Sequence, residues 1–214
     1  MLKLLALCKT VFMQSVDLIK AVAVAEYLLL LEPHEDLSNR IVQEKHLFYE
    51  KYKAAEAIRG KPHITLVHYR HYEEAEERIR QKLRIRAKEW SPFCVELMNY
   101  GSFPAHTIYI NIASRLSIQH LVKSIRTDAQ ALMKLDKDNK PHFILEPHIT
   151  IARRLKPWQY ESGWLEYSNK SFSGKFIAGH MTLLKRAGQE LPYKMVERFQ
   201  FRGMPVLPRQ GQMF

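Results

Sequence analysis

The sequence has few cysteines, no long apolar run and no familiar cofactor motif. Its two cysteines, Cys8 and Cys94, cannot build a disulfide framework, and no cysteine–histidine cluster has the spacing of a zinc site. We therefore expect a reducing, cytoplasmic location and no bound metal. A glycine-rich phosphate loop and a Lys-x-Asp-Gly adenylation motif are also missing, so the chain carries neither common signature of nucleotide-cofactor chemistry.

The N-terminal segment also lacks the features of a membrane anchor. Lys9, Asp17 and Lys20 interrupt its apolar residues, so that no run is long enough to span a bilayer. A secretory signal is the less favoured alternative, because the small residues at 21–25 follow a broken apolar centre. We interpret residues 1–24 as a leader, helical or disordered, or as an overextended start upstream of Met13. Residues 25–214 are then a single bilobal domain.

Positive charge is abundant. The chain has 33 Lys and Arg against 22 Asp and Glu, a net charge of +11, and residues 148–214 hold eleven of these cations against four Glu. Such an excess favours polyanionic partners through long-range attraction. A generally basic soluble protein would explain the charge equally well.

One short phrase occurs twice, as Pro62-His63-Ile64-Thr65 and Pro147-His148-Ile149-Thr150. In an extended strand, side chains alternate between faces, so the histidine and threonine of each phrase point the same way. Two such strands predict a pair of imidazoles and a pair of hydroxyls that converge on one ligand. A third triplet, His180-Met181-Thr182, lacks the preceding proline, and we interpret it as a structural strand.

Hydrophobic periodicity predicts the elements around these phrases. We expect strands at 27–31, 64–69, 93–98, 107–112, within 175–185 and at 196–201. Helices are expected from Leu37 up to Gly60, over 75–87 and over 118–132, the last capped by Ser117, and a short aromatic segment covers 158–167. Each phrase is thus preceded by a helix and followed by two strands. This repeat predicts an α+β fold of two pseudo-symmetric lobes, each an antiparallel sheet with helices packed outside, and a central cleft between them.

The paired phrases resemble the two-histidine phosphoesterase superfamily, in particular its branch of 2′-5′ RNA ligases or RNA 2′,3′-cyclic phosphodiesterases. The second phrase is similar to that branch through its trailing Arg153, and segments 101–110 and 181–186 with Tyr193 resemble the strand pairs that follow each motif. The resemblance covers residues 25–202. It implies hydrolysis of RNA 2′,3′-cyclic phosphate ends to 2′-phosphates without metal or cofactor, and 2′-5′ ligation when a 5′-hydroxyl replaces water.

The catalytic candidates are His63, His148, Thr65 and Thr150. Opening a cyclic phosphodiester requires a base that deprotonates water and an acid that protonates the leaving oxygen, and histidine can serve as either near neutral pH. The resemblance implies that His63 is the proton donor and His148 the acceptor. The threonine hydroxyls can donate hydrogen bonds to the nonbridging oxygens, where charge develops in the transition state.

Three further residues are candidates for substrate binding. Arg153 could bind phosphate, although a regular strand would turn it to the opposite face, so this role requires a strand end or a bulge. Tyr69 and Phe103, like Tyr109, could stack on a base, although an aromatic residue in a strand also commonly belongs to the core.

The expected partners are RNA ends or small cyclic-phosphate nucleotides, with no membrane association and a monomeric state. The continuation Val67-His68-Tyr69-Arg70 departs from the RNA-ligase pattern, so another small cyclic or 2′-5′-linked nucleotide stays open as the substrate. Two alternatives belong to other classes. One is a noncatalytic module that binds RNA or nucleotides, and the other is a basic interaction protein in which the phrases occur by chance.

Overall fold

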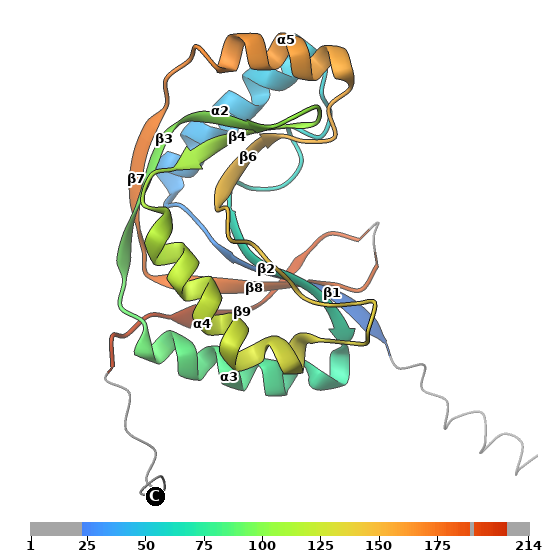
Figure 1. Ribbon diagram of the computed structural model, residues 1–214, viewed down its shortest axis with the longest axis vertical. Coiled ribbons are helices and arrows are strands. Elements are labelled where there is room, and N and C mark those ends of the chain that lie inside the picture. Colours follow the sequence, from blue (N-terminus) through green and yellow to red (C-terminus); the bar gives the residue numbers. More distant parts are fainter. Residues whose placement is uncertain (1–22, 189–190, 205–214) are drawn as a thin grey trace, which may run out of the picture.

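Every described strand belongs to one antiparallel sheet (Figure 1). The computed structural model describes residues 23–188 and 191–204. The strands are β1 (Val24–Leu31), β2 (Ile64–Tyr72), β3 (Phe93–Phe103), β4 (Thr107–Ile112), β5 (His142–Phe143), β6 (His148–Ala152), β7 (Ser173–Ala178), β8 (His180–Arg186) and β9 (Lys194–Gln200). The helices are α2 (Glu35–Tyr52), α3 (Glu76–Glu89), α4 (Arg115–Met133) and α5 (Pro157–Tyr167), with a short 3-10 turn, η1 (Glu73–Ala75).

The sheet has two four-stranded halves that meet at β6 and β2. Its order is β7-β3-β4-β6-β2-β1-β8-β9, with β5 paired to β2. Helices α2 and α5 cover the half that contains β6, and α3 and α4 cover the half that contains β2 (Figure 1). The sheet bends between the halves, so that its uncovered side forms a concave face. The predicted α+β fold of two related lobes is confirmed, and the two lobes share one continuous sheet.

The repeat along the chain does not divide the sheet into consecutive halves. Strands β3 and β4 follow the first phrase in the chain but lie in the half of the sheet that contains β6. Strands β8 and β9 follow the second phrase but lie in the half that contains β2. The chain crosses over at Gly179, so the segment expected to form strand within 175–185 is two strands, β7 and β8. It divides because β7 pairs with β3 and β8 pairs with β1, in opposite halves of the molecule.

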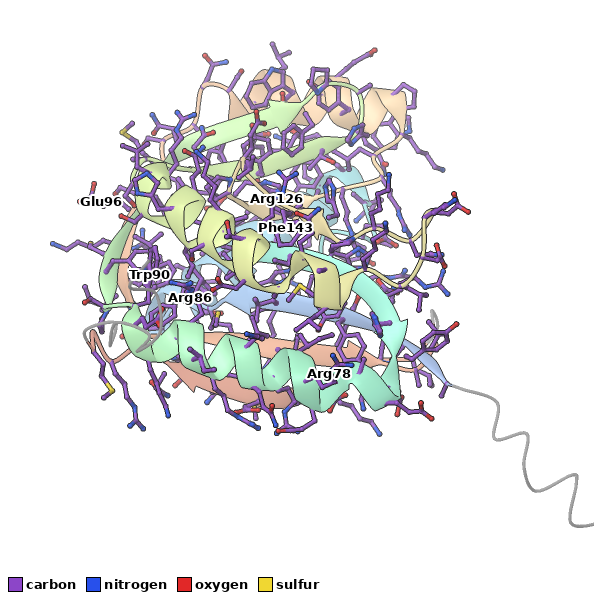
Figure 2. All side chains as sticks on the ribbon, turned by 60° about the horizontal axis from the view of Figure 1, so that its bottom comes forward. Arg78, Arg86, Trp90, Glu96, Arg126 and Phe143 are labelled. Carbon is purple, nitrogen blue, oxygen red and sulfur yellow. The ribbon has the colours of Figure 1, made fainter. Side chains whose placement is uncertain are left out.

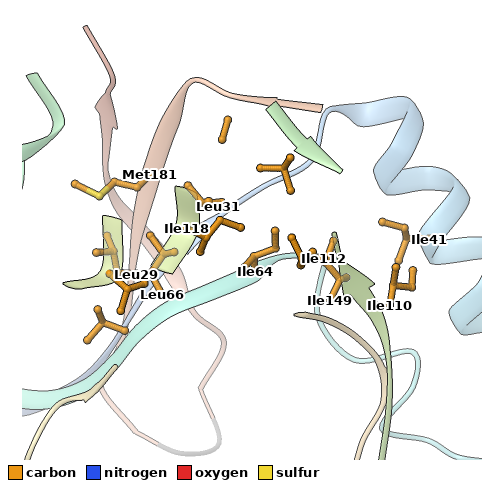
Figure 3. Packing of buried hydrophobic residues seen from close by; sticks show 14 of the residues in the cluster. Leu29, Leu31, Ile41, Ile64, Leu66, Ile110, Ile112, Ile118, Ile149 and Met181 are labelled. Carbon is orange, nitrogen blue, oxygen red and sulfur yellow. The ribbon is translucent and has the colours of Figure 1, made fainter. Parts of the chain in front are cut away.

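The core lies between the sheet and its helices. Alternate residues of β1, Tyr27, Leu29 and Leu31, are fully buried, and Figure 3 shows Leu29 and Leu31 packed with Ile64, Leu66 and Met181 of neighbouring strands. Period-two burial of this kind is expected for a sheet with helices on one face. The polar residues of the phrases lie on the other face, where Leu30 of β1 is also buried.

Two predicted helix ends were wrong. Helix α4 begins at Arg115 after Ser114, so Ser117 lies inside it, and the Ser114 hydroxyl accepts a hydrogen bond from the Glu96 amide of β3 instead. Helix α2 ends at Tyr52, because Lys53 adopts a left-handed conformation at φ 51° and closes the helix through its amide. Residues 55–60 form turns and a bend rather than the helical continuation expected up to Gly60.

The predicted leader, residues 1–24, falls almost entirely outside the described residues, which begin one residue before β1. None of the helices that the structure describes is long and apolar enough to cross a membrane.

Candidate active site

The two phrases lie side by side at the junction of the sheet halves. Ile64 of β2 pairs with Ile149 of β6 in antiparallel register, and both are fully buried. In this register His63 is opposite Thr150 and Thr65 is opposite His148, and all four side chains leave the sheet on its concave face. Diagonal neighbours such as the two histidines are roughly 7–8 Å apart between antiparallel strands, a separation that leaves room for one phosphate.

Both histidines are anchored in the same way. Nδ1 of His63 lies 2.8 Å from the carbonyl oxygen of Lys61, and Nδ1 of His148 lies 2.8 Å from that of Glu146. Because a carbonyl oxygen only accepts hydrogen bonds, Nδ1 carries the proton in each ring. Nε2 of each neutral imidazole is therefore an acceptor and is available to a ligand.

Burial lowers the pKa of both histidines. At His63, the nearby cations Lys45 and Arg153 lower the pKa further, while the bond to the Lys61 carbonyl and the charge of Glu32 oppose the shift. At His148, the bond to the Glu146 carbonyl and the charge of Glu146 oppose the effect of burial. Both rings are consequently mostly neutral at pH 7 before a ligand binds.

Aromatic side chains line the His148 side of this pair. The rings of Phe103 and Tyr109 each lie 5.0 Å from the His148 ring, centroid to centroid, and 4.7 Å from each other. Tyr109 pairs with Thr150 and Asn111 pairs with His148 across β4 and β6. A Cβ at Gly101 would lie 2.6 Å from both Tyr109 Cε2 and Asn111 Oδ1, so this wall requires glycine. Phe103 is thus close to the catalytic candidates.

Tyr69 does not reach this site, which corrects the prediction that it stacks on a base. Its side chain is 2% exposed and stacks on Tyr27 in the core, with ring centroids 4.9 Å apart. The reason is a bulge: the β1–β2 register shifts so that Thr65 pairs with Leu30 but Val67 pairs with Leu29. Strict alternation from Thr65 would have turned Tyr69 to the concave face, and the extra residue turns it inward.

Arg153 lies just beyond the end of a strand, the position that a phosphate-binding role would require. Strand β6 ends at Ala152, and Arg154 adopts a left-handed conformation at φ 53°. The Arg153 Nε atom is 3.7 Å from Glu56 Oε2, and Arg153 is close enough to His63 to lower the pKa of that histidine. The arginine is therefore close to the first phrase although it follows the second.

A buried lysine supports the first phrase and was missed in the sequence. Lys45 of α2 is 5% exposed, and its Nζ donates to the carbonyl oxygens of Arg59 (3.1 Å) and Gly60 (2.7 Å). Burial and the charge of Arg153 lower its pKa to about 8. One signal was available: Lys45 falls between Ile41 and Phe48 in the apolar stripe of α2, a position where a cation needs partners.

Glu56 links the same turn to Arg153. Its Oε1 accepts a hydrogen bond from Arg59 at 2.6 Å, and its buried Oε2 has no hydrogen-bond partner but faces Arg153. Segment 54–62, which leads into the first phrase, is thus tied both to α2 and to the end of β6.

In the part of the chain that the structure describes, no group of three or more His, Cys, Asp or Glu side chains could hold a metal ion. Cys94 is a free, exposed thiol on β3.

Known proteins share this fold. The family model of the 2′-5′ RNA ligase superfamily matches residues 33–190. Among solved structures, Escherichia coli LigT complexed with 3′-AMP matches with a TM-score of 0.56 and 14% identity, over 83% of this chain and 98% of that chain. TT0787 of Thermus thermophilus matches with a TM-score of 0.55 and 18% identity, over 83% and 98% of the two chains. No curated protein matches in sequence. Because the family model spans both phrases and most of the sheet, the chain belongs to the 2′-5′ RNA ligase superfamily of two-histidine phosphoesterases, which supports a phosphodiesterase activity.

Proposed function

We propose that the protein opens 2′,3′-cyclic phosphate ends of RNA by metal-independent hydrolysis and leaves a 2′-phosphate. The observation that carries this proposal is the matched pair of imidazoles on adjacent strands, each with Nδ1 bonded to a carbonyl and Nε2 available. E. coli LigT has been crystallised with 3′-AMP and with phosphate, and both ligands carry a phosphate group, as the proposed substrate and product do.

The reaction needs one neutral and one protonated imidazole. Nε2 of the neutral histidine takes a proton from water, and the water oxygen forms a bond to phosphorus. The bond from phosphorus to the 3′ oxygen breaks, and Nε2 of the protonated histidine gives its proton to that oxygen. Following the family resemblance, we assign the donor role to His63 and the acceptor role to His148. Each histidine ends in the other's protonation state, and solvent exchange restores the pair.

The remaining groups stabilise charge on phosphorus. Thr65 and Thr150 lie opposite the two histidines on the same face, so each hydroxyl can donate to a nonbridging oxygen. Arg153, beside His63, adds a fixed positive charge. A bound anion would also raise the pKa of the nearby histidines and favour the one protonated imidazole that the reaction requires.

Turnover of a defined substrate panel tests the proposal. Purified protein is incubated in EDTA with 2′,3′-cyclic mononucleotides, oligoribonucleotides ending in a cyclic phosphate, and 2′-5′-linked dimers, and the products are assigned by NMR. We expect the cyclic phosphates to open to 2′-phosphates. Products from the 2′-5′-linked dimers alone would instead assign the activity to a different phosphodiester.

Two variants connect the activity to the site. His63→Ala and His148→Ala should each abolish turnover while circular dichroism stays unchanged, and Tyr69→Phe, in the core, serves as the folded control. Full activity in both histidine variants would rule the mechanism out. Tight, salt-sensitive RNA binding with no turnover would favour the noncatalytic binding module.

A further inference from the structure

The third His-x-Thr triplet lies on the same face as the other two. Strand β1 separates β2 from β8, and its Leu30 pairs with Thr65 on one side and with Thr182 on the other. Strands β2 and β8 therefore run in the same direction. The pair His180 and Thr182 repeats the first phrase two strands away, which corresponds to roughly 10 Å.

Glu32 lies between the two triplets. Leu31 pairs with Ile64, so the next residue, Glu32, is beside His63 on one strand and beside His180 on the other. Thr182 is completely buried, and its hydroxyl donates to Glu32 Oε2 at 2.8 Å. Nε2 of His180 is buried without a hydrogen-bond partner, 4.0 Å from the same oxygen. Thr182 of the third triplet thus holds a carboxylate in place beside the first triplet.

Arg198 completes this cluster from the edge of the sheet. It pairs with Thr182 across β8 and β9, and its guanidinium lies 3.9 Å from Glu32 Oε2. The Arg198 side chain is 53% exposed and that of Glu32 is 28% exposed, so a ligand on the concave face can reach both. We call Glu32, His180, Thr182 and Arg198 the β8 cluster.

The two sides of the catalytic pair therefore differ in chemistry. Beyond His148 lie the aromatic rings of Phe103 and Tyr109, whereas beyond His63 lies the β8 cluster. Aromatic side chains suit an unpaired base, which stacks on them. Charged side chains suit the sugar–phosphate backbone. A substrate whose terminal base stacks beside His148 would direct its preceding nucleotide toward β1, β8 and β9.

We propose that the β8 cluster is a second subsite, which binds the nucleotide that precedes the cyclic-phosphate end, with its ribose 2′-hydroxyl on Glu32 and its phosphodiester on Arg198. This inference rests on the proposed function. A carboxylate repels phosphate but accepts a hydrogen bond from a ribose hydroxyl, and a guanidinium binds phosphate through parallel donors. Since DNA lacks the 2′-hydroxyl, Glu32 would select RNA at this position. The preferred substrate is then an oligoribonucleotide rather than a mononucleotide.

Binding measurements that need no turnover test the subsite. Three ligands ending in a 2′-phosphate are compared by calorimetry: a mononucleotide, a diribonucleotide, and the same dinucleotide with a 2′-deoxy first residue. The wild-type protein should bind the diribonucleotide about tenfold or more tightly than its deoxy counterpart, as expected for one hydrogen bond to a charged group. Glu32→Gln should bring this ratio close to one, and Arg198→Ala should remove most of the gain of dinucleotide over mononucleotide.

Matched variants far from the cluster serve as controls. Glu96→Gln makes the same charge change at an exposed position of β3. Arg78→Ala removes an exposed arginine from α3, which covers the opposite face of the sheet (Figure 2). Both should keep the two binding ratios of the wild-type protein.

Three outcomes separate the possibilities. If Glu32→Gln changes the turnover of cyclic mononucleotides but leaves the ribose ratio intact, Glu32 acts on His63 and the subsite is wrong. If Arg198→Ala weakens the binding of all three ligands equally, Arg198 contributes general charge only and the proposal is overturned. If no cyclic phosphate is hydrolysed but both ratios respond as expected, the subsite stands and the proposed reaction fails.

Discussion

Ile64 and Ile149 form the pair through which the two halves of the sheet meet. Both side chains point into the core, so the residues on either side of each isoleucine point to the concave face. One buried pair therefore brings two histidines and two threonines together from distant parts of the chain. The geometry of the proposed reaction follows from this register, because a slip of one residue in either strand would turn its triplet to the core face.

The pH dependence of turnover should reflect the lowered pKa values of both histidines. Since the reaction needs one neutral and one protonated ring, kcat/KM should rise and fall around an optimum below pH 6.5, the ordinary histidine value. Above the optimum, the donor loses its proton; below it, the acceptor gains one. Initial rates in EDTA between pH 4 and pH 9 measure the profile, and an optimum above pH 7.5 would contradict the assignment.

The threonine hydroxyls should contribute to the transition state. Thr65→Val and Thr150→Val keep the shape of the side chain but remove the donor, and each should lower kcat by roughly 10²-fold, as for other single donors of this kind. Thr→Ser at the same positions retains the hydroxyl and should recover much of the loss. Equal rates for the valine and serine variants would show that the hydroxyls do not act on the phosphate.

Lys45 should act as a positioning residue. Lys45→Met removes the donor that holds the carbonyl oxygens of Arg59 and Gly60, immediately before the Lys61 carbonyl that anchors His63. Displacement of a catalytic group by about 1 Å can lower activity by up to 10²-fold. We expect a tenfold or larger loss in kcat/KM, while urea titration shows that the variant remains folded at 25 °C. Lys51→Met, on the exposed side of α2, is the control.

Gly101 should be required for the aromatic wall. Gly101→Ala places a methyl group 2.6 Å from Tyr109 and Asn111, and overpacking of this kind destabilises by about 1–3 kcal/mol. The variant should also raise KM, because Tyr109 must move beside His148. Gly179→Ala is the matched control, since no atom lies within 4 Å of its new methyl group. If the Gly101→Ala protein were fully active and fully stable, Tyr109 would have no role in substrate binding.

Phe103 and Tyr69 should behave differently although both are strand aromatics. Phe103→Ala removes a ring beside His148 and should raise KM about tenfold or more, because base stacking contributes roughly 1–3 kcal/mol per base. Tyr69→Phe removes a buried hydroxyl that has no hydrogen-bond partner, so activity should not change and stability should hold or increase. Steady-state kinetics and thermal unfolding of both variants measure the contrast.

Local sequence patterns predicted the strands, most of the helices and the paired triplets. The alternation in Ile64-Thr65-Leu66 and Ile149-Thr150-Ile151 was enough to place each histidine and threonine on one face, because strand geometry depends on neighbouring residues only. The prediction that Tyr69 stacks on a base was wrong, because the β1–β2 bulge that turns this residue into the core is a property of two strands and not of one. Helix α2 ends at the left-handed backbone of Lys53, and the residue before α4, Ser114, bonds to Glu96 of β3; hydrophobic periodicity records neither feature.

The sequence predicted the chemistry proposed for this protein: two imidazoles and two hydroxyls at strand positions that face a common ligand, and an arginine that needed a strand end to join them. Tertiary structure alone decided their surroundings. The exchange of strands between the halves places β8 beside β1, so that Thr182 donates to Glu32, which the β1–β2 register places beside His63. The packing of α2 against the turn before His63 brings Lys45 to the carbonyl oxygens of Arg59 and Gly60. These contacts join residues far apart in the chain, and such pairings are set by the packing of whole elements, which no local pattern encodes.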